Sequence, residues 1–91
     1  MTGCEMPTIS FFYGISIRIY FREPPPPHFH AVYGSHEAVI DIRSLQLRTG
    51  RLPPRATALV LEWARVHQAD LMHAWDQAAR RVSPDQITPL D

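Results

Sequence analysis

The chain has 91 residues, nine acidic and nine basic side chains, and a formal net charge of zero at pH 7. This length provides one small domain. Zero net charge argues against strong nucleic-acid binding by the chain alone, because such binding depends on neutralising phosphates. The single cysteine, Cys4, excludes an intrachain disulfide, and no apolar run of about 20 residues predicts a membrane span. We therefore expect a soluble, cytoplasmic protein that gains stability by association, as a homo-oligomer or with a partner.

The first five residues, MTGCE, are followed by a second methionine, and MPTIS reads as a natural start. We therefore treat residues 1–5 as a disordered leader and do not expect Cys4 to have a catalytic role. The rest of the chain predicts a single domain over residues 6–82 and a C-terminal tail over residues 83–91.

Alternating apolar residues predict strands in the first half of the chain. ISFFYG (9–14) and ISIRIYFR (15–22) read as two strands, the second with one apolar and one polar face. On the polar face we identify candidate binding residues for a phosphate or carboxylate: Arg18, Tyr20 and Arg22. EPPPP (23–27) predicts a stiff, extended connector, because proline lacks the N–H that a sheet requires.

HFHAVY (28–33) and EAVIDIR (37–43) predict a hairpin around a two-residue Gly34-Ser35 loop. This register pairs Tyr33 with His36 and collects the large apolar side chains on one face. A slip by one residue would scramble that face. In LQLRTGRL (45–52), Leu45 and Leu47 alternate, and a turn is expected at Gly50.

The opposite face of this hairpin carries the candidate site. His28 and His30 are two residues apart and therefore point the same way, and His28 lies opposite Asp41. Two imidazoles and a carboxylate suit a divalent metal such as zinc, and a His–Asp pair also suits a general base. A solvent-exposed face with incidental histidines fits the same pattern, so structural, metal-binding and catalytic readings stay open.

Residues 53–81 predict one long helix, about 40 Å in length. Its core-facing stripe includes Trp63, His67 and Leu71, where we expect His67 to be packed; His36 and His73 look exposed. A second apolar stripe carries Leu61, Met72 and Trp75. One sheet face does not easily cover both stripes, so we interpret the second as a docking surface.

The segments MPTISFFYGISIRIYF, PPHFHAVYG, EAVIDI, GRLPPRA and LVLEWARVHQADLMHAW follow one another over residues 6–90. Together they resemble a bacterial family known as domain of unknown function 4160. Its members are often encoded beside a small protein of domain of unknown function 2442. The resemblance implies a protein partner in a two-gene, toxin–antitoxin-like or regulatory pair, and it implies no reaction.

We therefore predict an α+β fold, with a mostly antiparallel sheet of three to five short strands packed on one face by a long C-terminal helix. The function predicted first is a protein-interaction module, one component of a bacterial two-gene pair. The alternative is a small metal- or histidine-dependent hydrolase or nuclease acting at His28, His30 and Asp41.

Overall fold

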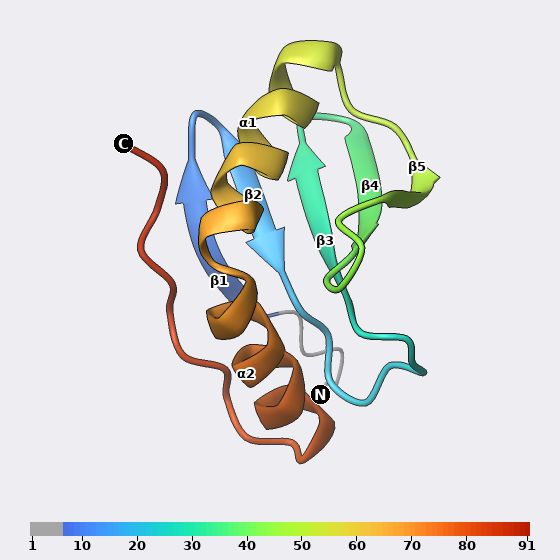
Figure 1. Ribbon diagram of the computed structural model, residues 1–91, viewed down its shortest axis with the longest axis vertical. Helices are drawn as coiled ribbons and strands as arrows, with labels where there is room; N and C mark the ends of the chain where they lie inside the picture. Colours follow the sequence, from blue (N-terminus) through green and yellow to red (C-terminus); the bar gives the residue numbers. More distant parts are fainter. Residues whose placement is uncertain (1–6) are drawn as a thin grey trace.

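The computed structural model describes residues 7–91, which form a five-stranded antiparallel sheet in the order β1-β2-β3-β4-β5. Two helices follow the sheet in the chain. The elements are β1 (Thr8–Phe12), β2 (Ile15–Arg18), β3 (His28–Tyr33), β4 (His36–Asp41), β5 (Leu47–Gly50), α1 (Pro54–Val66) and α2 (Gln68–Ala79). Figure 1 shows α1 lying across one face of the sheet and α2 continuing past the end of the strands. The predicted α+β arrangement is confirmed. The predicted leader lies outside the described residues.

The β3–β4 hairpin has the predicted register. Tyr33 pairs with His36, and Phe29 pairs with Ile40. Gly34 opens the two-residue loop with a φ of 59°, a conformation that glycine adopts without steric cost. The two neighbours of Phe29 in β3, His28 and His30, therefore face away from α1.

Trp63 is the centre of the core between the sheet and α1. Its ring lies 5.3 Å from that of Phe12 and 6.1 Å from that of Phe29, measured between centroids. Its indole N–H donates to the carbonyl of Thr88 at 2.8 Å. Trp63 thus joins the sheet, the helix and the C-terminal segment.

The prediction of one continuous helix over residues 53–81 is wrong. The helix is interrupted at His67, whose φ of −111° and ψ of 26° lie outside the helical range and separate α1 from α2. His67 is packed, as expected, with its ring 5.4 Å from that of Trp63. Neither helix has the length and apolar character needed to cross a membrane.

The second apolar stripe is not the exposed surface that the sequence predicts. Trp75 is only 8% exposed and belongs to the core. Leu61 and Met72 are partly buried and pack against the same core. The interruption at His67 changes which residues of α2 face the protein, so a straight-helix projection does not apply across it.

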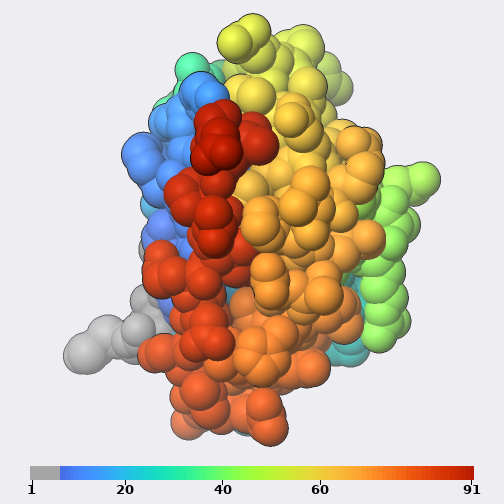
Figure 2. Space-filling model, turned by 60° about the vertical axis from the view of Figure 1, so that its left-hand side comes forward, coloured from blue at the N-terminus to red at the C-terminus, as the bar shows by residue number. Residues whose placement is uncertain are grey.

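Residues 83–91 do not form a separate tail. Ile87 is buried in the core, and its N–H donates to the carbonyl of Ile9 at 2.8 Å. The buried hydroxyl of Ser10 donates to the carbonyl of Ile87 at 2.9 Å. Figure 2 shows this segment in red between β1 and the helices. It therefore covers the open edge of β1, and the domain extends beyond residue 82.

Replacing Trp63 with alanine should destabilise the fold by about 3–5 kcal/mol, because the change removes a large core side chain and leaves a cavity. Chemical denaturation of the parent protein and the variant measures this difference. Val66→Ala is the control on the same helix, since Val66 is 74% exposed. Equal denaturation midpoints for Trp63→Ala and Val66→Ala would show that the core is centred elsewhere.

Candidate metal centre

His28 and His30 open strand β3 and point to the same side of it. Both are buried, with 9% and 7% of their surfaces exposed. Their ring centroids lie 5.4 Å apart in an edge-to-face arrangement. Burial of two adjacent imidazoles calls for partners for four ring nitrogens, because an unpaired buried polar group costs free energy.

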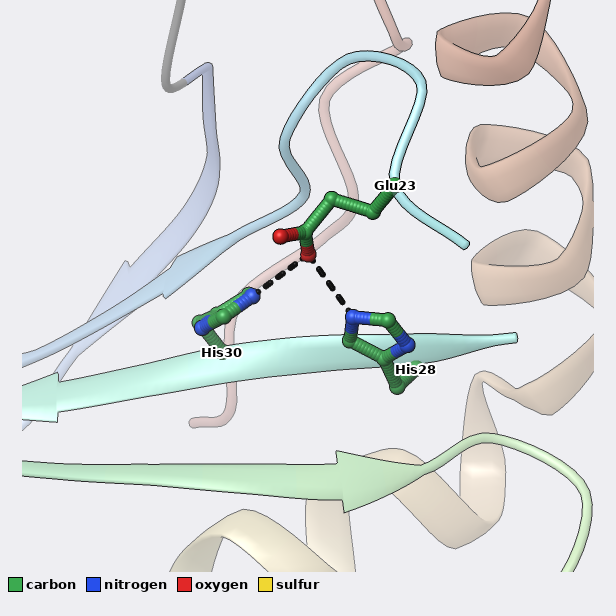
Figure 3. Close-up of side chains that lie close together, drawn as sticks. All are labelled: Glu23, His28 and His30. Atoms are coloured by element: carbon green, nitrogen blue, oxygen red, sulfur yellow. Dashed lines mark hydrogen bonds and ion pairs between the residues drawn. The ribbon is translucent and has the colours of Figure 1, made fainter. Parts of the chain in front are cut away.

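Glu23 provides the partner that the two rings share. It lies in the connection between β2 and β3, and its Oε1 atom is 2.7 Å from Nε2 of His28 and 2.8 Å from Nε2 of His30. Figure 3 shows the carboxylate reaching from this connection toward both rings. The proline run that follows Glu23 includes a cis peptide bond between Pro25 and Pro26. Glu23, His28 and His30 each offer one ligand atom, all within 4.8 Å of one another.

The outer nitrogens of both rings are held as well. Nδ1 of His28 lies 2.8 Å from the carbonyl oxygen of Pro26, and Nδ1 of His30 lies 2.9 Å from Oε2 of Glu37. A carbonyl oxygen only accepts, so Nδ1 of His28 carries a proton and donates it. Partners of this kind commonly fix the tautomer of histidines that bind metals.

These contacts leave the site short of protons when both rings are neutral. Four ring nitrogens face oxygen acceptors, but two neutral imidazoles supply only two N–H groups. With both Nδ1 atoms donating outward, both Nε2 lone pairs point at Glu23. Two further protons, or one cation among the three groups, resolve the repulsion between these lone pairs and the carboxylate.

The electrostatic balance at Glu23 favours the charged carboxylate. Burial is the largest single effect and by itself raises the pKa of Glu23. Hydrogen bonds from His30 and His28, together with the positive charge that these rings can carry, outweigh burial and lower the pKa below its ordinary value. These hydrogen bonds need a proton on each Nε2, so they belong to the metal-free site, and there Glu23 is an anion at neutral pH. A bound metal would replace those protons and meet the same anionic carboxylate.

A second group of polar residues adjoins His30. The ring of Tyr20 stacks on the imidazole with 4.1 Å between centroids, and Arg18 pairs with His30 across β2 and β3. Burial and the charge of Glu37 raise the pKa of Tyr20, while a hydrogen bond from Arg18 and the charge of Arg18 act in the opposite direction. Tyr20 therefore keeps its proton at neutral pH. Two of the three predicted anion-binding residues thus border the histidines.

The third of these residues, Arg22, is not positioned by the strand. β2 ends at Arg18, and Arg22 lies in a turn with a φ of 56°. Its backbone N–H lies 3.4 Å from the carbonyl of Ala78 in α2. Alternation along a strand therefore does not determine where its side chain points.

The predicted site differs from the observed one in its carboxylate. Asp41 pairs with His28 across the strands as expected, but its Oδ1 atom accepts the N–H groups of Arg43 and Ser44 at 2.8 and 2.9 Å. The bond from Ser44 is the main reason that the pKa of Asp41 is lowered. Asp41 thus holds its own turn, and Glu23 takes the place predicted for it beside the two rings.

The site also touches α2, which the sequence does not predict. The indole of Trp75 lies 5.0 Å from the imidazole of His28, measured between ring centroids. This contact helps to bury His28. The role predicted for Trp75, a docking residue exposed to solvent, is replaced by a packing role behind the histidine.

Comparison with known proteins identifies a family. A family model described as Domain of unknown function (DUF4160) matches residues 14–76, well over half of the chain. The chain belongs to this family. No curated protein and no solved structure shows a significant match to this chain. The DUF4160 match includes the three residues of the triad and their neighbours Arg18 and Tyr20.

Replacing Glu23 with glutamine should remove a pH-dependent part of the stability. The folded pKa of Glu23 lies below its ordinary value of 4.5, so the unfolded state binds protons first as the pH falls. The contribution of Glu23 is therefore present above pH 4.5 and is lost as the pH falls through the folded pKa. Urea denaturation between pH 3 and pH 7 should show that the unfolding free energies of the parent and the variant become more similar as the pH falls.

Glu62→Gln is the matched control, since Glu62 lies on the exposed face of α1. The difference in unfolding free energy between Glu62→Gln and the parent should change little over the same pH range. A difference between the parent protein and Glu23→Gln that stays constant from pH 7 to pH 3 would contradict the proposed role of Glu23.

Proposed function

We propose that this DUF4160 domain is a binding module for a divalent transition metal, held by Glu23, His28 and His30. The observation that carries the proposal is the convergence of both Nε2 atoms on one carboxylate oxygen, while both Nδ1 atoms are anchored on the far side. Zinc fits this set of ligands best, because two imidazoles and one carboxylate form a common zinc site with one position open. We assign binding, and no reaction, to these residues.

Binding of a metal requires the three ligand atoms, which lie within 4.8 Å of one another, to adjust their separations. Zinc–nitrogen bonds of about 2.0–2.1 Å place neighbouring tetrahedral ligand atoms roughly 3.3 Å apart. The two contacts of Glu23 measure 2.7 and 2.8 Å, so its oxygen needs to retreat by about 0.5 Å to reach that separation. Glu23 lies in a connection between strands, where such a shift disturbs no ladder hydrogen bond.

Calorimetric titration of metal-free protein with zinc should show one saturable site per chain. Replacing His28, His30 or Glu23 with alanine removes one of three ligands, and each change should weaken binding by about 100-fold or more. Glu37→Gln should weaken binding by roughly 10-fold, because Glu37 orients the ring of His30. Manganese and nickel serve as comparison ions.

His73→Ala is the matched control for this titration. Its side chain is 60% exposed and its ring contacts Asp85, away from the triad, so zinc affinity should be unchanged. Absence of saturable zinc binding to the parent, or equal affinity in Glu23→Ala and the parent, would overturn the proposed metal site.

The second candidate function is the binding of another protein, as the family resemblance implies. The supporting observation is a hollow of about 210 Å³ whose lining includes Tyr13, Tyr33, Arg55 and Leu59. Tyr13 is 56% exposed, and tyrosine and arginine are the residue types that often anchor interfaces. We propose the small protein encoded by the adjacent gene in the bacterial cytoplasm as the partner, with self-association as the other form of contact.

Co-expression with the neighbouring protein tests this interaction. Tyr33→Asp should abolish co-purification or reduce the mass measured by light scattering, because it places a charge at the edge of the hollow. Val82→Asp is the control, since Val82 is similarly exposed and does not line the hollow. The same mass and the same co-purification for parent and Tyr33→Asp would exclude this surface.

A further inference from the structure

Arg18 has an unmet hydrogen-bonding capacity beside the triad. Its Nε atom is buried and has no hydrogen-bond partner. Within residues 7–91, the only ion pair that an arginine makes is that of Arg48 with Asp41. Buried donors are nearly always paired, so an orphan of this kind requires an explanation, and a bound ligand is one.

Arg18 is placed on the same side of the sheet as the triad. It pairs directly with His30 in the β2–β3 ladder, and directly paired residues project from the same face. His30 is also a ligand of the proposed metal site. The side chain of Arg18 therefore leaves the sheet on the face that carries His30.

Tyr20 adds a second donor at this place. Its ring stacks on His30, and its hydroxyl lies 3.4 Å from Oε2 of Glu37. This separation is long for a hydrogen bond between two oxygens. Arg18 also hydrogen-bonds to this hydroxyl, so the two groups lie together, and the hydroxyl proton can turn from Glu37 to a ligand with a better-placed oxygen.

We propose that the site takes a phosphate group, with one oxygen at the open position of the metal and others bonded to Arg18 and Tyr20. This inference rests on the metal site proposed above. The metal, which accepts an oxygen lone pair, and the two hydrogen-bond donors Arg18 and Tyr20 suit a tetrahedral group that presents an oxygen to each, whereas a carboxylate has only two oxygens. Arginine matches phosphate geometry through paired N–H donors.

The charges at the site support an anionic ligand. With a divalent metal present and both rings neutral, the metal and Arg18 exceed the negative charges of Glu23 and Glu37 by one. Neighbouring positive charge in a partly buried site attracts an anion more strongly than it would in open water. Free phosphate and a phosphate monoester share the chemistry that this site recognises.

The test uses the full chain loaded with one equivalent of cobalt, whose visible spectrum reports a change of ligands. Titration with inorganic phosphate should change the spectrum saturably, with one phosphate per chain. Phenyl phosphate, a monoester, is the second arm and decides whether the esterified group fits better than the free ion. Acetate, the carboxylate arm, should bind more weakly than either.

Arg18→Met should weaken phosphate binding by roughly 10-fold to 100-fold, as expected for losing charge-assisted hydrogen bonds, and should leave cobalt affinity within about 2-fold. Arg18→Lys keeps the charge without the paired donors and should give an intermediate loss. Tyr20→Phe should give a smaller loss than Arg18→Met. Arg65→Met, at an exposed position on α1, is the control and should bind phosphate like the parent.

The outcomes separate this inference from the metal site. Cobalt binding with no spectral response to phosphate, or equal phosphate affinity in Arg18→Met and Arg65→Met, overturns the phosphate inference and leaves the metal site standing. Phosphate that binds equally tightly without cobalt would overturn the proposed arrangement, in which one phosphate contacts both the metal and Arg18. Failure of cobalt and zinc to bind overturns both proposals.

Discussion

The candidate site depends on the extended conformation of β3 from its first residue. His28 and His30 share a face only because the strand alternates without a bulge between them, and the ladder with β4 fixes that alternation. The apolar residue between them, Phe29, packs against Trp63 on the other face. The core therefore holds the rings in place indirectly, since a change of register would exchange the buried phenyl group for an imidazole.

The connection between β2 and β3 supplies what the strand does not. Glu23 precedes four prolines, and the chain must reverse within residues 19–27 to pair β3 antiparallel to β2. The reversal brings the Glu23 carboxylate back to the rings, while the carbonyl of Pro26 accepts the outer proton of His28. The connector thus contributes one hydrogen-bond acceptor to each side of His28. A flexible polar loop in its place would lose more conformational entropy when it became ordered around the ring.

The parts of the structure that depend on periodicity were predictable, and the parts that depend on chain path were not. The β3–β4 register followed from where the apolar residues lie and from a two-residue glycine loop. Glu37 was also within reach of prediction, because it shares the face of His30 in that register. Glu23 was not, since an irregular segment has no period that could place its side chain.

The helical region shows the same limit. A stripe of apolar residues was recognised correctly, but its projection assumed a straight helix through His67. The interruption there gave Trp75 a place in the core. Residues 83–91 carry no regular pattern, so nothing in the sequence indicated that Ile87 would pack beside Ile9 or that Thr88 would accept the proton of Trp63.

The proposed metal site requires both histidines to present Nε2 to a shared cation and to keep a proton on Nδ1. Nuclear magnetic resonance of the imidazole nitrogens, correlated to the ring protons in labelled protein, tests this directly. On addition of one equivalent of zinc, we expect the Nε2 signals of His28 and His30 both to move to the metal-bound range while both Nδ1 atoms remain protonated. Zinc bound at Nδ1, or a response from only one of the two rings, would contradict the proposed metal site.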